Sequence, residues 1–508
     1  MINSKVRQAG RLLVVVTFSS FLFACDDSAL DAGTLVFVEA PQASAEFVPV
    51  VDGPAETRST PFLAWPFDLS TSGYTEEEYL LSGTGNTYNY VDDAGENPLV
   101  TTTATDVPYT TRILVRKPVS PVNFNGTVYV EILNPSLSHD VDFLWQYTHR
   151  AIMDDGGIWV GVTGTVATLN YLRDSWGQGS LTRNNSRYAT LDMDDDAQSW
   201  DVLTQLGELL KAGNVPQNPL AGYFVERNFL VSFSRSAENV VTYAVSFHDA
   251  AEMPDGSDVY DGYFASGGSS TGKHVAPLIG GTRLPKGDAR NLLPGDVPSI
   301  RYQTQTEMLP GFQVEDVRQL ANEYPLVRHY EVAGAAHIDA ESDALGQPFL
   351  ERDIGRSVYF PPPFCPDADN TPLRQSGSAS ALLIALDRWV RDGTEPPPAK
   401  FISLVDDGGD LALDMDADGN VKGGVRPPTL DVPAGVYKTR LVPFAPCFLL
   451  GGYEAFDAGE MVSRYGTADA FLDAMQIKVD EAIAEGFLLP ADGDLVMLDA
   501  EAAALVFP

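Results

Sequence analysis

The chain has 508 residues, of which 44% are hydrophobic and 20% charged, and its formal net charge is −37 at pH 7. This length and composition allow a large buried core, either as one large domain or as two to three smaller ones. The acidic surplus repels nucleic acid and anionic lipid headgroups, so we do not expect either of them as a partner.

The first 24 residues have the pattern of a signal peptide. Three basic residues precede the apolar run LLVVVTFSSFLF (12–23), which is too short to span a bilayer. Leu22, Ala24 and Cys25 then resemble a bacterial lipobox, in which the cysteine carries the lipid. We expect residues 1–24 to be a lipoprotein signal peptide and Cys25 to anchor the protein in the bacterial cell envelope, facing the periplasm or the surface. The alternative is a secreted protein with an incidental cysteine.

Residues 25–60 are rich in Ala, Pro, Ser, Asp and Glu and show little periodicity, so they are expected to be a flexible tether. Residues 61–508 then form the folded domain. Two cysteines remain in it, Cys365 and Cys447, and an exported chain can join them in a disulfide. Two buried thiols are the alternative.

Short β-branched and aromatic runs alternate with helical patterns from about residue 110 onward. Strands are predicted at 112–119, 127–133, 158–164, 228–233, 262–266, 299–306 and 326–334. Helices are predicted within 197–213, 377–393 and 466–488. This alternation predicts an α/β fold whose sheet is mainly parallel and flanked by helices. Residues 395–455 are turn-rich and are expected to be a small insertion or lid, followed by C-terminal helices.

Three serines stand at alternate positions where the strand 228–233 meets a helical pattern, in the motif S-F-S-R-S (232–236). A nucleophile elbow needs small residues two positions before and after the nucleophile, because strand and helix backbones nearly touch there. Ser232 and Ser236 meet that steric need around Ser234. An ordinary turn is the alternative, and the Arg235 N–H would be the first oxyanion donor.

A base and an acid for Ser234 occur later in the chain. His337 follows a strand that ends in small residues, which is where an α/β-hydrolase presents its histidine. Glu307 follows the strand 299–306 and could orient the imidazole, with Asp316 as a second choice. The order Ser234, Glu307, His337 is the order of an α/β-hydrolase triad.

Several segments resemble a family of bacterial exported "alpha/beta hydrolase domain" proteins, a group of serine esterases, over roughly residues 100–505. They are VEILNPS (130–136), IWVGVTGT (158–165), SWDVLTQ (199–205), SFSRSA (232–237), TQTEM (304–308), HYEVAGAAHID (329–339), ALDRWVRDGTEPP (385–397) and DADGNVKGGVRPP (416–428). The resemblance implies an α/β-hydrolase fold with Ser234 as nucleophile, Glu307 as acid and His337 as base. The family's elbow usually reads G-x-S-Q-S, so Ser232 and Arg235 depart from it. Arg235 could favour an anionic substrate or simply lie on the surface.

A second oxyanion donor is expected in the loop after the strand 127–133, from the backbone N–H of Ser136 or Leu137, because Pro135 has none. Two other motifs are discounted. GGSSTGK (267–273) lacks the Ser or Thr and the helix of a phosphate loop. DMDADGN (414–420) lacks the carboxylate at the twelfth position of a calcium loop. We therefore expect neither a metal nor an organic cofactor.

These observations favour a lipid-anchored serine hydrolase that cleaves small carboxylic esters through an acyl-enzyme on Ser234. A catalytically silent ligand-binding lipoprotein on a hydrolase scaffold is the alternative, which the non-glycine elbow supports. Amide or polyester substrates also remain open, because the loops that shape the pocket decide between them.

Overall fold

A computed structural model describes residues 42–50, 60–92, 97–176, 186–268, 274–276, 283–285, 288–308, 318, 321, 323–356, 359, 371–408, 410–438 and 447–508. The predicted signal peptide, Cys25, Asp316 and Cys365 lie outside these residues. Within them, none of the helices combines the length and the hydropathy that a membrane crossing requires.

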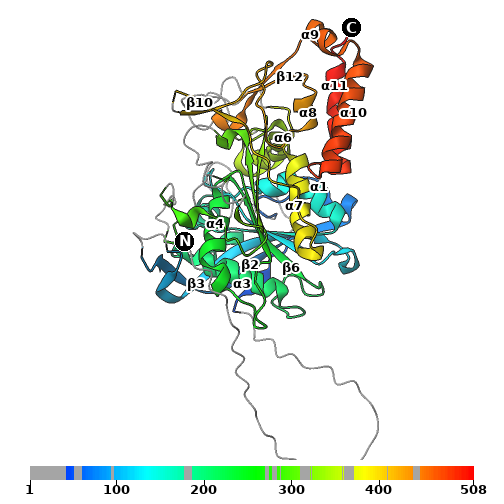
Figure 1. The fold of residues 1–508 in the computed structure, drawn as a ribbon. Helices are drawn as coiled ribbons and strands as arrows, with labels where there is room; N and C mark the ends of the chain where they lie inside the picture. Colours follow the sequence, from blue (N-terminus) through cyan, green and yellow to red (C-terminus); the bar gives the residue numbers. More distant parts are fainter. Residues whose placement is uncertain are drawn as a thin grey trace, which may run out of the picture. The chain divides into compact units, whose positions relative to one another are not determined.

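A nine-stranded sheet forms the centre of the fold, with the order β1-β2-β3-β5-β4-β6-β7-β8-β9 (Figure 1). Its strands are β1 (Ser44–Phe47), β2 (Tyr74–Tyr90), β3 (Val100–Pro118), β4 (Thr127–Ile132), β5 (Ile158–Val162), β6 (Arg227–Phe233), β7 (Gly262–Ser266), β8 (Ser299–Thr304) and β9 (Val327–Val332). The first three pairings, up to β3–β5, are antiparallel, and all later ones are parallel. The predicted α/β fold with a mainly parallel sheet is confirmed.

The central parallel strands were predictable because they are buried along their whole length. Both faces of such strands are covered, so they read as continuous runs of β-branched and aromatic residues. The polar strand β2 and the first half of β3 were not predicted. The tether prediction is wrong at Ser44–Phe47, which form β1: this strand is mostly exposed and is held by main-chain pairing with β2, which leaves little pattern in its side chains.

Helices pack on both faces of the sheet. In Figure 1, α3 (Ser199–Lys211) and α4 (Ala237–Ser246) lie on one face, and α1 (Phe143–Asp155) and α7 (Ser376–Asp392) on the other. The shorter α2 (Val166–Asn170) follows β5, and α6 (Ala340–Phe349) follows β9. The bounds of α3 and α7 lie within two residues of the predicted ones, because periodic apolar faces and a capping glycine such as Gly393 define them.

The turn-rich segment after α7 is joined to the edge of the sheet, because Lys400 and Val425 make parallel bridges with Tyr330 and Val332 of β9. It contains β10 (Leu404–Asp407), β11 (Asp410–Leu413), α8 (Pro428–Asp431), β12 (Gly435–Lys438) and β13 (Gly452–Ala455). The helices α9 (Ala458–Tyr465), α10 (Ala468–Glu485) and α11 (Pro490–Ala504) follow and bury a second, smaller apolar cluster. A lid function for residues 395–455 stays a prediction.

Cys447 begins a short 3-10 helix, η12 (Cys447–Leu450), and is disulfide-bonded. The other two cysteines of the chain lie outside the described residues, so the predicted pairing with Cys365 stays a prediction.

Two fully buried arginines of β3 fix the segment that precedes β2. Arg112 donates to the carbonyl oxygen of Phe62 over 2.8 Å, and Arg116 donates to that of Leu63 over 3.1 Å. Each guanidinium also binds two carboxylates, from Glu78 and Asp140 and from Glu76 and Asp142, respectively. Such a network costs desolvation but specifies one arrangement, because removing any partner leaves a buried charge unpaired.

The same region holds His149 of α1 in an aromatic environment. Its ring lies 5.0 Å from that of Trp65 and 5.8 Å from that of Trp145, measured between centroids. Burial, with a further contribution from the charge of Arg150, lowers the pKa of His149 to about 4. The folded protein therefore binds this proton less readily than the unfolded chain does, and stability is lost as the pH falls from about 6.5 towards 4.

We predict that His149→Gln reduces this loss. The difference in the free energy of unfolding between pH 7 and pH 5 should shrink by about 2 kcal/mol relative to the wild type, because glutamine has no proton to gain. Urea unfolding of both proteins at the two pH values measures this difference. An equal difference in the two proteins would contradict the assignment.

Candidate functional site

Ser234 occupies a tight turn between β6 and the 3-10 helix η7 (Ser234–Ser236), which continues into α4. Its φ is +63°, a left-handed conformation that costs energy for a residue with a Cβ. Three other described non-glycine residues share a positive φ, and one of them, Ser138, lies in the loop after β4. Strained residues therefore occur on two loops that meet at this edge of the sheet.

Hydrogen bonds between the elbow and the end of β4 hold the turn in place. Ser232 donates to the carbonyl oxygen of Ile132 over 2.7 Å, and Ser236 donates to that of Leu133 over 3.0 Å. In the other direction, the Asn134 side chain donates to the carbonyl oxygen of Phe233 over 2.8 Å. Ser232 and Ser236 thus fill the small-residue positions and also satisfy buried main-chain oxygens.

His337 lies in the loop between β9 and α6 and reaches the elbow. Its Nε2 is 2.8 Å from Ser234 Oγ, and its Nδ1 is 2.6 Å from Glu307 Oε1. The structure therefore brings together the three side chains that were selected from the sequence. With Glu307 on Nδ1, the tautomer that places the proton there leaves Nε2 free to accept the serine proton.

Glu307 is held in the short 3-10 helix η10 (Gln305–Met308), which directly follows β8. The second oxygen of its carboxylate, Oε2, accepts from the backbone N–H of Thr304 over 2.6 Å and from its hydroxyl over 2.7 Å. Both oxygens of this buried carboxylate therefore have partners: Oε2 is held by Thr304, and Oε1 faces the imidazole.

Three further side chains position the histidine loop, and sequence reasoning missed all of them. Thr306 Oγ1 accepts from the His337 N–H over 3.1 Å, while Tyr147 and Gln375 donate to the His337 carbonyl oxygen over 3.1 Å and 3.0 Å. Thr306 lies in the motif TQTEM, next to Glu307, and its place beside the acid was the one sequence signal that could have identified it. Tyr147 and Gln375 lie in α1 and just before α7, where nothing local marks them.

Asp339, two residues after His337, caps the start of α6. Its carboxylate accepts the N–H of Ser342 over 2.8 Å and the N–H of Gln375 over 3.0 Å. Burial raises the pKa of Asp339 to about 7 despite these two donors. This group therefore ties the histidine loop to the segment that carries Gln375.

The structure corrects part of the prediction of the oxyanion donors. The Ser136 N–H donates to Oδ1 of Asn134 over 2.8 Å, so the prediction of Ser136 as a donor is wrong in this structure. The side chain of Asn134 closes a turn and takes up that amide, which strand and loop patterns do not reveal. The Leu137 N–H, the other candidate, makes no hydrogen bond to any described residue. The Arg235 N–H belongs to the first turn of a helix, where amides lack helical acceptors.

The two discounted motifs have structural roles where they are described. Gly267 and Gly268, which begin the motif GGSSTGK, pack against the elbow: a Cβ on Gly268 would lie 3.1 Å from the Ser234 carbonyl oxygen. Asp416 of the motif DMDADGN accepts the N–H groups of Asp418 and Asn420 and closes a turn. Within the described residues, His, Cys, Asp and Glu form no group of three or more that could hold a metal ion.

No curated protein matches the sequence. An alpha-beta serine hydrolase homologue from Coxiella burnetii is 11% identical, with 45% of this chain and 84% of that chain covered and a TM-score of 0.26. A carboxylesterase from Lactobacillus plantarum WCFS1 is 12% identical, with 44% and 78% covered and a TM-score of 0.28. A cold-adapted esterase from an Arctic intertidal metagenomic library is 10% identical, with 55% and 91% covered and a TM-score of 0.26.

These structural similarities are low, so the assignment rests on the sequence match to a family model. The model described as "Alpha/beta hydrolase domain" matches residues 46–497, which is most of the chain. This chain therefore belongs to the alpha/beta hydrolase domain family.

Proposed function

We propose that the protein is a serine hydrolase that cleaves carboxylic esters through an acyl-enzyme intermediate on Ser234. The observation that supports this most directly is the continuous chain of short contacts from Ser234 Oγ through the His337 imidazole to Glu307. The predicted lipid anchor at Cys25 would place this activity in the cell envelope and remains a proposal from the sequence.

In the acylation step, Ser234 Oγ bonds to the carbonyl carbon of the ester while its proton passes to Nε2 of His337. The imidazolium that forms is stabilised by Glu307, which keeps its negative charge. When the tetrahedral intermediate collapses, the bond to the leaving oxygen breaks and His337 returns the proton to the departing alcohol. A water molecule, activated by His337, then attacks the acyl-enzyme and releases the carboxylic acid.

The developing oxyanion needs N–H donors in place before the reaction. The Arg235 N–H at the start of the helix is the first donor in this proposal. The Leu137 N–H is the second, since the amide of Ser136 is occupied. Asn134 would hold the two loops at a fixed separation, because it bonds the main chain of both.

The alternative function is a catalytically silent binding protein on a hydrolase scaffold. Its support was the presence of serines where glycine is usual in the elbow. Their hydroxyl groups bond the main chain of β4. This arrangement fits a formed elbow, so we prefer the enzyme.

The side chain of Arg235 supports a finer proposal on the substrate. It is partly buried beside the nucleophile and has no ion pair or hydrogen bond with any described residue. The chain has 70 acidic and 33 basic residues, so a guanidinium with no carboxylate partner in the described part of the chain is unexpected. We propose that Arg235 binds a carboxylate of the substrate, which would make half-esters of dicarboxylic acids better substrates than neutral esters.

We expect Ser234→Ala to abolish the hydrolysis of 4-nitrophenyl butyrate and labelling by a fluorophosphonate probe. The melting temperature should stay within a few degrees, because the hydroxyl makes one hydrogen bond that the fold does not need. Ser246→Ala, in the same helical region, is the matched control and should keep both activities. Turnover that survives in the Ser234 variant would refute the nucleophile, and no labelling of the wild type would favour the silent scaffold.

Gly267→Ala tests whether close packing positions the imidazole. Gly267 has a φ of +61°, and a Cβ there would lie 2.8 Å from the Phe233 ring and 3.3 Å from His337 Cε1. Gly213→Ala is the control, because its φ is +67° and a Cβ would meet nothing within 4 Å. Both variants should lose about 1–2 kcal/mol of stability from the backbone strain. The fluorophosphonate probe should also label Gly267→Ala at least about tenfold more slowly than the wild type. Equal labelling rates in the two variants would show that this contact does not position His337.

Arg235→Gln should lower kcat/KM for the half-ester 4-nitrophenyl glutarate by about ten- to a hundredfold, the worth of a charge-assisted hydrogen bond. The value for neutral 4-nitrophenyl butyrate should change by less than about threefold, because that substrate has no carboxylate to lose. Arg388→Gln, which removes an exposed arginine of α7, is the control. An equal fall for both substrates would overturn the role of the side chain.

A further inference from the structure

The C-terminal segment surrounds a cavity that lies apart from the candidate active site. Its volume is about 440 Å³, and Ser234, Glu307 and His337 are not among the residues that line it. Its walls come from α8, α9, α10, α11, β12 and β13, together with the start of α7. A volume of this size is in the range of small-molecule sites.

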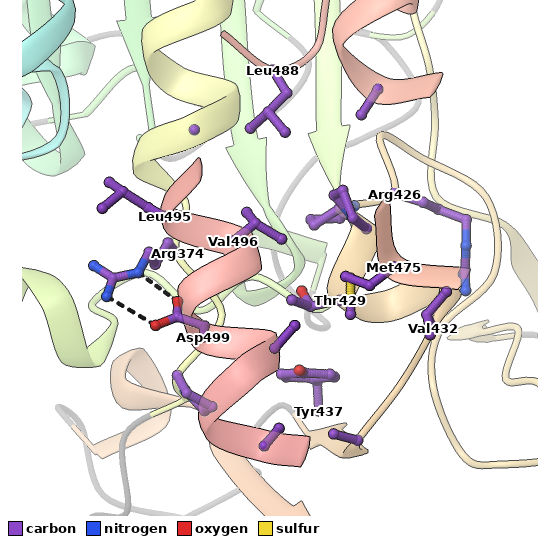
Figure 2. A pocket seen from close by; sticks show the side chains of 18 of the residues that line it. Arg374, Arg426, Thr429, Val432, Tyr437, Met475, Leu488, Leu495, Val496 and Asp499 are labelled. Atoms are coloured by element: carbon purple, nitrogen blue, oxygen red, sulfur yellow. Dashed lines mark hydrogen bonds and ion pairs between the residues drawn. The ribbon is translucent and has the colours of Figure 1, made fainter. Parts of the chain in front are cut away.

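The walls of this cavity are mainly apolar. They include Met461, Phe471, Met475, Leu488 and Val496. Figure 2 shows Leu488 at one end and Tyr437 at the other, with Met475 and Val496 between them in this view. Thr429 lies towards the same end as Tyr437, so two hydroxyl groups occur at that end of a mainly apolar wall.

Each charged group in the lining has an oppositely charged neighbour, of which the most distant is Arg150, 3.7 Å from Asp492. Arg374 binds Asp499 through two contacts of 2.6 Å and 3.2 Å, drawn in Figure 2, and also lies 2.8 Å from Glu341. Arg426 binds Asp431 and donates to the carbonyl oxygen of Leu430 over 3.0 Å. A ligand that carried a charge would therefore have to displace an existing partner, and an uncharged ligand would not.

The cavity is partly open to solvent, so part of its apolar wall faces water instead of packed protein. Water in such a space needs two to four polar partners, and most of the wall residues are apolar and offer none. A hydrocarbon chain would instead restore the dispersion contacts that the wall residues lack.

We propose that this cavity binds an uncharged lipophilic molecule, a hydrocarbon chain with a single hydroxyl or ester group directed to Thr429 and Tyr437. Met461 and Met475 line the cavity but are themselves buried, so a longer chain would be accommodated by a shift of these flexible thioether side chains. The proposal does not rest on the hydrolase activity, and either can fail without the other.

The site is tested first by binding to the purified protein. Nile red, an uncharged dye that fluoresces in apolar surroundings, should bind saturably, and 1-decanol should displace it. Decanoate, which has the same chain length and a negative charge, should displace it at least tenfold less well. Absence of saturable dye binding, or equal displacement by the alcohol and the acid, would overturn the proposal.

Two matched substitutions on α10 locate the binding. Ala482 lines the cavity, whereas Ala484 on the same helix is exposed and is not among the lining residues. Ala482→Phe fills the space and should weaken Nile red binding at least tenfold, while Ala484→Phe should bind as the wild type does. Both variants should melt as cooperatively as the wild type, and full binding by a folded Ala482→Phe variant would place the dye elsewhere.

Photolabelling of the wild type gives an answer even if Ala482→Phe does not fold. A decanol analogue with a diazirine near the end of its chain should label peptides of α10 and α11, as mapped by mass spectrometry. Excess 1-decanol should prevent this labelling. Labels confined to peptides that contain no lining residue would overturn the proposal.

Discussion

The candidate site depends on one junction, where the elbow after β6 is bonded to the end of β4. Ser234 can hold a φ of +63° because the residues on either side of it are fixed to a neighbouring parallel strand. Backbone strain of this kind costs about 1–3 kcal/mol, and buried hydrogen bonds contribute about 1 kcal/mol each. The bonds made by Ser232, Ser236 and Asn134 are therefore sufficient in number to offset the strain.

The same junction explains why serine can stand where glycine is usual. The steric requirement at these positions is a small side chain, and a serine hydroxyl meets it while donating to a main-chain oxygen that a glycine would leave to another donor. The elbow motif is thus a rule about volume and not about glycine itself. For that reason S-F-S-R-S alone was a weak signal, and the order of serine, acid and histidine along the chain was the stronger one.

The parts of the fold that the sequence predicted are those whose side chains are fixed by burial. Strands β4 to β9 are rich in β-branched and aromatic residues, and helices α3 and α7 have a periodic apolar face, so the sequence pattern predicted them. Strand β1 is held by main-chain pairing, and β2 and the start of β3 are polar. None of these three segments has an apolar pattern, so the sequence did not predict them. The prediction of Ser136 as an oxyanion donor was wrong because its N–H donates to the Asn134 side chain, a contact that no residue pattern shows. Thr306, Tyr147 and Gln375 could not be found without the fold, because they act on His337 from three separate elements.

The serine and the histidine are held in different ways. The elbow is fixed by the adjacent strand, whereas the histidine loop is also fixed by the end of the chain: Ile338 donates to the carbonyl oxygen of Leu449 over 2.9 Å, and Gln375 binds the carbonyl oxygen of His337. Val425 exchanges hydrogen bonds with Glu331 and Ala333 on the strand that leads into the same loop. The segment after α7 is therefore part of what places the imidazole, whatever else it covers. Arg374 and Ser376, on either side of Gln375, line the C-terminal cavity. The hydrogen bond from Gln375 to the carbonyl oxygen of His337 is thus made from a stretch of backbone that also forms part of the cavity wall.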